Sequence, residues 1–222
     1  MSTAITSASS LNLAVAGVLG RMAAGVGATF VVAALINAAG LVPVLFQGIL
    51  GYVFMFAPLA MSLFLMWRAE RMTASESRAW FYAFATVMGI SLSIIFAVYT
   101  SASIAFALMG TTVSFAALAG WGYFTKRDLS GWGPFLFAGV IGVVIASIVG
   151  IFIESTAFQM TINVLCILIF LGLTAYDMNR IREVLWNGGE DLERLQWFSA
   201  LSLYINFINI FVSMLQLFGN RE

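Results

Sequence analysis

The sequence contains no histidine and only one cysteine. Histidine is the usual general base near neutral pH, the commonest zinc ligand and the usual pH switch, so its absence removes all three roles together. The single cysteine, Cys166, lies in the apolar run VLCILIF, which excludes a disulfide or a thiolate metal cluster within one chain. Any group that titrates is therefore a carboxylate, a cysteine, a tyrosine or a lysine.

Charge is also scarce. Only 9% of the residues are charged, and the 10 Lys and Arg residues equal the 10 Asp and Glu residues, so no net charge favours nucleic acid as a partner. By contrast, 62% of the residues are hydrophobic and the mean hydropathy is +1.00. This composition predicts an integral membrane protein whose partner is the lipid bilayer.

Long uncharged runs predict where the chain crosses the membrane. A span needs roughly 20 apolar residues. Residues 22–67 and 79–125 are each long enough for two spans, with turns expected near Gly40 and Pro43 and at YTSAS. Three further spans are predicted at residues 133–153, 158–176 and 201–218. We therefore expect an all-α integral membrane protein with seven transmembrane helices.

The expected division of the chain is a cytoplasmic N-terminal segment (1–20), a seven-helix membrane domain (21–219) and a C-terminal tail (220–222). The stretch 180–196 is predicted to be a cytoplasmic loop with short helical shoulders. The orientation follows from cations that lie at alternate connections: Arg21, Arg68, Arg71, Arg78, Lys126, Arg127, Arg180, Arg182 and Arg194. Cations in short loops mark the cytoplasmic side, which predicts a cytoplasmic N-terminus. The C-terminus lies outside if the last segment crosses fully, and a re-entrant last segment would reverse this.

Polar residues recur along the last apolar segment. They step by three or four residues, so they share one face of a helix: Ser199, Ser202, Asn206, Asn209, Ser213 and Gln216, here called the polar stripe. Lipid cannot satisfy amides, so this face must look into protein or water, which makes the last helix the central one. Such residues either join helices by hydrogen bonds or line a pathway.

A second polar feature is Asp177, in LTAYDMNRIRE at the end of the sixth span. It shares one helical face with Asn163, Cys166 and Thr174, which suggests that it points inward. The alternative is an exposed aspartate that pairs with Arg180 or Arg182 at the membrane surface.

The chain offers little for enzyme chemistry. An aspartyl intramembrane protease needs two carboxylates within the membrane, and Asp177 is the one candidate. A serine protease needs a base for its nucleophile, and histidine is missing. No P-loop or dinucleotide-binding glycine pattern occurs. We expect a protein that is not an enzyme and has no cofactor.

Four segments in order resemble the Bax inhibitor-1 family, in its bacterial branch: TSASIAFALM, GYFTKRDLSGWGPFLF, GLTAYDMNRIRE and ALSLYINFIN. The resemblance covers nearly the whole chain and implies seven helices, six of them wrapped around the last. It also implies a pH-sensitive calcium leak channel in the bacterial inner membrane. In this family the sensor is two aspartates, one in a YD motif after the sixth helix and one in the last helix.

Asp177 matches the first sensor aspartate, but Asn206 occupies the position of the second. An amide has a permanent N–H donor, so Asn206 can hydrogen-bond an ionised Asp177 without sharing a proton. Such a pair would act as a latch, a contact between two helices that holds the pathway closed, and this latch is expected to respond weakly to pH. In some members an arginine at the cytoplasmic end of the second helix supports the latch, and Arg68 is the nearest match here.

The resemblance thus implies a calcium or cation leak channel with a weakened pH latch. The latch and ion pathway would use Asp177, Asn206 and Arg68, and the lining would use Asn209, Ser213 and Ser202. Ca²⁺ is the expected permeant ion, held weakly at Asp177, because calcium prefers about six to eight oxygen ligands.

Two other functions remain open from the sequence. One is a non-conducting regulator that binds other membrane proteins, such as the membrane-embedded ATP-dependent protease with which some bacterial relatives are associated. The loss of the second aspartate favours it. The other is a proton-coupled transporter of a defined solute, which would show saturable uptake.

Overall fold

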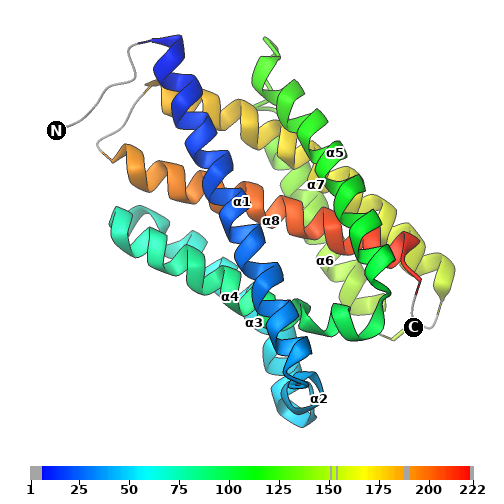
Figure 1. Ribbon diagram of the computed structural model, residues 1–222. Helices are drawn as coiled ribbons and strands as arrows, with labels where there is room; N and C mark the ends of the chain where they lie inside the picture. Colours follow the sequence, from blue (N-terminus) through cyan, green and yellow to red (C-terminus); the bar gives the residue numbers. More distant parts are fainter. Residues whose placement is uncertain (1–6, 151, 154, 188–190, 221–222) are drawn as a thin grey trace. The chain divides into compact units, whose positions relative to one another are not determined.

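The structure, a computed structural model, describes residues 7–150, 152–153, 155–187 and 191–220, and most of these residues lie in helices (Figure 1). The helices are α1 (Ala8–Ala38), α2 (Val42–Leu45), α3 (Gly48–Arg68), the 3-10 turn η1 (Ala69–Arg71), α4 (Ala74–Val98), α5 (Ser101–Phe124), α6 (Trp132–Gly150), α7 (Thr156–Asn187) and α8 (Leu192–Phe218). Among the described residues, seven of these helices are long and apolar enough to cross a membrane. The predicted number of spans is therefore confirmed.

The turn after α1 forms where glycine and proline predict it. Gly40 has a positive φ of 66°, a conformation that glycine adopts without steric cost. The backbone N–H of Leu41 donates to the carbonyl of Ile36 at 3.1 Å, which satisfies a carbonyl that the helix end leaves open. Pro43 lies in the first turn of α2, where its missing N–H costs no helical hydrogen bond.

The α4 helix begins at a capping box. The Thr73 hydroxyl accepts from the backbone N–H of Glu76 at 3.3 Å, and the Glu76 carboxylate accepts from the backbone N–H of Thr73 at 2.8 Å. α4 ends at Val98 and α5 begins at Ser101, so the turn predicted at YTSAS is confirmed.

The structure corrects the expectation for residues 180–196. Most of this stretch is helical, because α7 continues to Asn187 and α8 already begins at Leu192. The prediction of a loop with short helical shoulders is therefore wrong for most of its length, and Gly188 and Gly189 at its middle lie outside the described residues. Charges end an apolar span, but they do not interrupt the backbone hydrogen bonds that continue a helix into water. For the same reason α1 begins at Ala8, well before the predicted span.

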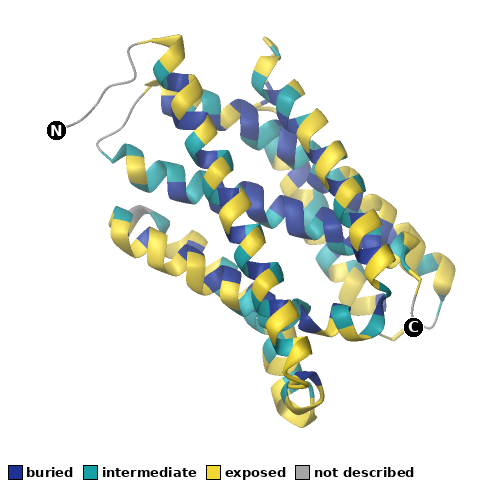
Figure 2. Cartoon of the chain, in the orientation of Figure 1, coloured by how far each residue is buried: buried dark blue, intermediate teal, exposed yellow. Residues whose placement is uncertain are grey.

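The C-terminal helix α8 is the most buried of the seven (Figure 2). In its most apolar 18-residue window, 61% of the residues are buried, whereas this share lies between 6% and 33% in the other six helices. α8 also contacts α1, α4 and α7. The prediction that the polar stripe marks an inner helix is confirmed.

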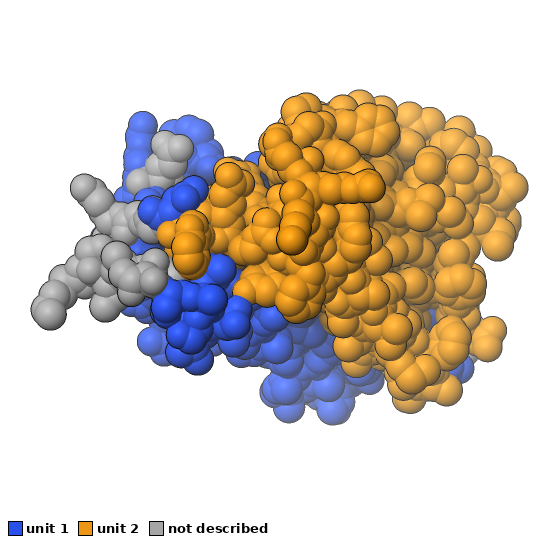
Figure 3. Space-filling model, turned by 90° about the horizontal axis from the view of Figure 1, so that it is seen from above, with its two compact units in different colours: residues 1–100, 187–204, 221–222 blue, residues 101–186, 205–220 orange. Residues whose placement is uncertain are grey.

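Contacts between residues group the chain into two compact units (Figure 3). Unit 1 contains α1 to α4 and the first part of α8, up to Tyr204. Unit 2 contains α5, α6, α7 up to Trp186, and the second part of α8 from Ile205. The polar stripe is therefore shared, with Ser199 and Ser202 in unit 1 and its other members in unit 2.

The core of unit 1 is aromatic and joins α1, α4 and α8. The Tyr204 ring lies 5.8 Å from that of Phe81 and 5.7 Å from that of Phe84, both at edge-to-face angles. At Gly25 an added Cβ would lie 2.4 Å from the Phe81 ring, so only glycine fits. The Thr29 hydroxyl completes this core, 2.6 Å from the Tyr204 hydroxyl.

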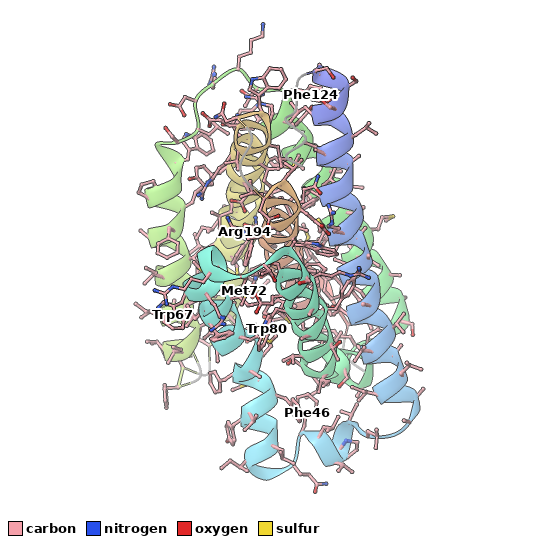
Figure 4. All side chains as sticks on the ribbon, turned by 90° about the vertical axis from the view of Figure 1, so that its left-hand side faces the viewer. Phe46, Trp67, Met72, Trp80, Phe124 and Arg194 are labelled. Atoms are coloured by element: carbon pink, nitrogen blue, oxygen red, sulfur yellow. The ribbon has the colours of Figure 1, made fainter. Side chains whose placement is uncertain are left out.

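The end of α3 is held to α8 within unit 1. Arg194 donates at 3.0 Å to the carbonyl of Ala69, in the turn η1 that follows α3, and Met72 directly after this turn is 3% exposed (Arg194 and Met72 are labelled in Figure 4). Arg21 of α1 stacks over Trp197 of α8, with 4.8 Å from its guanidinium carbon to the ring centroid. These contacts attach the first part of α8 to both α1 and the α3 end.

Candidate functional site

The α7 helix holds Asp177 well inside its length, ten residues before its last residue Asn187. The side chain is half-buried, and the next two residues, Met178 and Asn179, are buried. The carboxylate accepts a hydrogen bond from α8. Of the two interpretations of Asp177 from the sequence, the inward one agrees with this geometry.

The partner on α8 is Asn206, which is 3% exposed. Its Nδ2 donates to the Oδ2 of Asp177 at 2.7 Å. A hydrogen bond to an ionised group is shorter and stronger than one between neutral groups. The structure thus contains the contact that the two motifs suggest, and we call these two residues the latch pair.

Within unit 2, the remaining stripe residues make different contacts. The Asn209 amide donates to the carbonyl of Ile205 in its own helix at 2.8 Å. Ser213 is 4% exposed and its hydroxyl lies within hydrogen-bond reach of the Cys166 thiol of α7. Gln216 is exposed. The stripe is therefore partly a set of interhelical and local hydrogen bonds.

The α7 residues that were expected to share the face of Asp177 do lie inward. Asn163 and Thr174 are buried, and Cys166 is half-buried. The Thr174 hydroxyl donates to the carbonyl of Phe170 one turn earlier at 2.7 Å. Within unit 2, the latch pair and the approach of Cys166 to Ser213 are two polar contacts between this face of α7 and α8.

Arg68 is the last residue of α3 and is exposed. It lies close enough to Glu76 at the start of α4 to stabilise the charge of that carboxylate. Arg68 belongs to unit 1, whereas Asp177 belongs to unit 2. Its role beside the latch pair stays a prediction.

Sequence reasoning missed two polar groups, one in each unit. Asn179 and Arg182 of α7 donate to backbone carbonyls at the C-terminal end of α5, whereas the sequence suggested for Arg182 a topological role or an ion pair with Asp177. The second group is the hydroxyl contact between Thr29 and Tyr204. Neither group could be predicted from neighbouring residues, because the partners are far apart in the sequence. The carbonyls that accept from Asn179 and Arg182 lie 57 and 59 residues away, and Thr29 and Tyr204 are 175 residues apart.

Among the described residues, no group of three or more His, Cys, Asp or Glu side chains comes together. Asp177 supplies one carboxylate here, and the Asn206 amide donates to it. Such a donor set fits transient contact with a hydrated cation better than a resident ion. The expected weak Ca²⁺ contact at Asp177 stays a prediction.

Comparison with known protein families shows to which other proteins this chain is related. Residues 11–222 match the family model described as inhibitor of apoptosis-promoting Bax1. The chain belongs to the Bax inhibitor-1 family. This membership agrees with the resemblance that the four motifs carry, including the two that supply the latch pair.

Bacterial members of the Bax inhibitor-1 family resemble this chain over most of its length. An uncharacterised protein of Caulobacter vibrioides is 42% identical over 171 residues, 75% of this chain and 68% of that protein. The inner membrane protein YbhL of Escherichia coli is 38% identical over 174 residues, 75% of this chain and 73% of that protein. A protein of Rickettsia prowazekii is 34% identical over 180 residues, 80% of this chain and 76% of that protein.

Proposed function

We propose that this protein is a calcium or cation leak pathway of the bacterial inner membrane, with a pH latch that is weakened because the second sensor position is Asn206. The observation that supports the proposal is a 2.7 Å hydrogen bond between two helices. Asn206 of α8, the most buried helix, donates it to Asp177 of α7. The inner-membrane location is supported by the similarity to YbhL of Escherichia coli.

The latch pair differs from a pair of aspartates in one physical respect. Two adjacent carboxylates cannot both ionise cheaply, so they share a proton and titrate as a coupled unit. Asn206 donates its N–H at every pH, so its contact with an ionised Asp177 needs no shared proton. The contact persists over a wider pH range, and conduction is expected to be small and nearly flat with pH.

The proposed pathway follows the polar stripe. Asn209, Ser213 and Ser202 supply amide and hydroxyl oxygens, and Asp177 supplies one formal charge. Because calcium prefers about six to eight oxygens, one carboxylate binds it weakly and allows it to leave. Arg68 is proposed to support the closed latch, since a cation near a carboxylate favours its charged form.

The test is calcium flux into proteoliposomes between pH 5 and pH 8. The native protein is compared with Asn206→Asp, which restores the second carboxylate. The proposal expects a small flat flux for the native protein and a clear pH step for Asn206→Asp. Asn37→Asp is the control: it makes the same amide-to-carboxyl change at an exposed position of α1, outside the proposed pathway, and should leave the flux small and flat with pH.

The rival function is a non-conducting regulator that binds other membrane proteins, such as a membrane-embedded ATP-dependent protease. The observation that favours it is the amide at position 206, which removes half of the family's sensor. Absence of flux in the native protein and in Asn206→Asp at every pH would reject the pathway and leave the regulator. Saturable uptake of one solute would instead indicate a transporter.

The proposed orientation places the N-terminus in the cytoplasm. It rests on the cations at alternate connections and on the seven helices long enough to span. Fusion of a cytoplasmic fluorescent reporter or a periplasmic enzyme reporter at each connection tests it. A fluorescent signal from a fusion after Phe124 and enzyme activity from a fusion after Gly40 are expected, and the reverse pattern would overturn the orientation.

A further inference from the structure

Two α7 side chains close to Asp177 bind the end of another helix. Asn179 Nδ2 donates to the carbonyl of Gly122 at 3.3 Å. Arg182 Nη1 donates to the carbonyls of Tyr123 at 2.6 Å and Thr125 at 3.0 Å. All three acceptors lie at the C-terminal end of α5 or just beyond it. We call Asn179 and Arg182 the α5 clamp.

The α5 clamp satisfies a need that every helix end has. The last carbonyls of a helix lack intrahelical donors and carry partial negative charge. The Arg182 guanidinium supplies the missing donors and offsets the negative charge, because it brings several N–H groups and a positive charge to that helix end. Asn179 is 7% exposed, so its hydrogen bond to Gly122 is made in the protein interior.

Backbone packing joins the same two helices. A Cβ added at Gly122 would lie 2.2 Å from the carbonyl oxygen of Ala175 and 2.8 Å from its Cα. A backbone-to-backbone approach this close leaves no room for a side chain at position 122. Glycines at such crossings are typical of tightly packed membrane helices. The close contact and the α5 clamp are adjacent in both helices.

The other side of α7 meets α8 through side chains. The latch pair is one contact, and the Cys166 thiol near the Ser213 hydroxyl is another. Side chains change rotamer easily, whereas a backbone contact between two helices changes only if a whole helix moves. Within unit 2, α7 is therefore joined rigidly to α5 and more loosely to α8.

We infer that Asn179 and Arg182 are positioning residues that fix α7 to the end of α5, so that Asp177 stays in place when the latch pair separates. This inference rests on the proposed function and deepens it, because it states which side of the latch is held fixed. It assigns the two residues no direct contact with an ion.

Distances between spin labels test the inference in the full-length protein with Cys166 replaced by Ala. One label pair, at Phe124 and Trp186, reports on α5 and α7, and a second, at Met160 and Gln216, reports on α7 and α8. All four side chains are exposed. Phe124 stands at the C-terminal end of α5 (Figure 4). Pulsed electron paramagnetic resonance gives each distance distribution.

Breaking the latch pair with Asn206→Ala is expected to shift or broaden the α7–α8 distribution and to leave the α5–α7 distribution unchanged. Equal broadening of both pairs, or no change in the α7–α8 pair, would overturn the inference. Removing the guanidinium with Arg182→Met is expected to broaden the α5–α7 distribution. An unchanged α5–α7 distribution in that variant would also overturn it.

Arg182→Lys separates positioning from a general effect on folding. Lysine keeps the charge but lacks the planar group that reaches two carbonyls, so the α5–α7 distribution should lie between native and Arg182→Met. If Arg182→Met does not fold, Arg182→Lys and Asn179→Ala give the same comparison. None of these readouts needs conduction, so flux failure would reject the proposed function while the distances still decide the inference.

Discussion

Two polar contacts on α8 lie only two residues apart, yet they differ in kind. At Tyr204, in unit 1, neutral hydroxyls and carbonyls meet: the Thr29 hydroxyl lies 2.6 Å from that of Tyr204 and within 2.9 Å of the Ala85 carbonyl. At Asn206, in unit 2, an amide meets a carboxylate. The first contact is the same at every pH near neutrality, whereas the second depends on the charge of Asp177.

The surroundings of the two contacts differ as well. Tyr204 and Thr29 are both 0% exposed, and two phenylalanine rings enclose the tyrosine. Asp177 is only half-buried. A buried neutral network makes one arrangement rigid, whereas a partly accessible charge can change state. The comparison suggests that the unit 1 contact anchors α8 and the unit 2 contact is the responsive one.

The largest expected effect on stability comes from removing Tyr204, the residue that anchors α8 in unit 1. Tyr204→Ala deletes a buried aromatic ring and the partner of the Thr29 hydroxyl, so the free energy of unfolding should fall by about 3–5 kcal/mol. Thermal unfolding in detergent measures it. The matched control is Tyr82→Ala on α4, whose ring is partly exposed. An equal loss in that control would contradict the assignment of Tyr204 as the anchor.

The latch pair should stabilise the protein less than the contact at Tyr204 does, and its contribution should depend on the charge of Asp177. Asn206→Leu removes the donor to Asp177 while keeping similar volume, at an expected loss of about 1–3 kcal/mol at pH 8. Because Asn206 donates to the ionised carboxylate without sharing a proton, the loss should stay nearly the same from pH 8 to pH 5 and shrink only at a pH low enough to protonate Asp177. Melting temperatures of native and variant protein at both pH values measure this.

The same comparison in an Asp177→Asn background isolates the effect of the Asp177 charge. In Asp177→Asn the residue at position 177 is neutral at every pH, so Asn206→Leu should cost less there and the cost should not change with pH. A loss that is equally large in both backgrounds would mean that packing at position 206, and not the charge of Asp177, determines the result.

The hydroxyl contact alone should have a smaller effect. Tyr204→Phe keeps the ring and removes one interhelical hydrogen bond, which in membrane proteins is worth about 0.6 kcal/mol on average. The loss should be the same at pH 5 and pH 8, because no group in the contact ionises in that range. A double-mutant cycle with Thr29→Val measures the coupling, and zero coupling would show that the two hydroxyls do not interact.

The smallest expected effect lies at Ser213. Ser213→Ala removes a hydroxyl that lies near the weak donor Cys166, so the loss should not exceed about 0.6 kcal/mol. If the residue also lines the proposed pathway, flux through Asn206→Asp should change when Ser213→Ala is added. Unchanged stability together with unchanged flux would limit Ser213 to packing.

Several features of the fold follow from single residues. The turn at Gly40 and Pro43 was predictable because positive φ and the missing N–H act locally. The spacing of the polar stripe predicted that α8 is an inner helix, because lipid cannot satisfy amides. The pairing of Asp177 with Asn206 was suggested by a resemblance in two motifs, and geometry alone would not have chosen it from the sequence.

Other features required the tertiary structure. Gly122 resembles any other glycine of an apolar helix until Ala175 of α7 is placed against it. Arg182 resembles an ordinary cytoplasmic cation until the carbonyls at the end of α5 are placed beside it. Asn209 shares the register of Asn206 but bonds its own helix. These roles depend on acceptors far away in the chain.

The amino-acid order alone therefore dictates the class of protein, the number of spans and the inner helix, because transfer into lipid depends on each segment's own composition and period. Tertiary structure decides how long the helices continue beyond the membrane, which stripe residues meet a partner and how α7 is held between α5 and α8. The physical reason is that hydrogen bonds and backbone contacts are short-ranged, so they depend on helix placement that local periodicity does not contain.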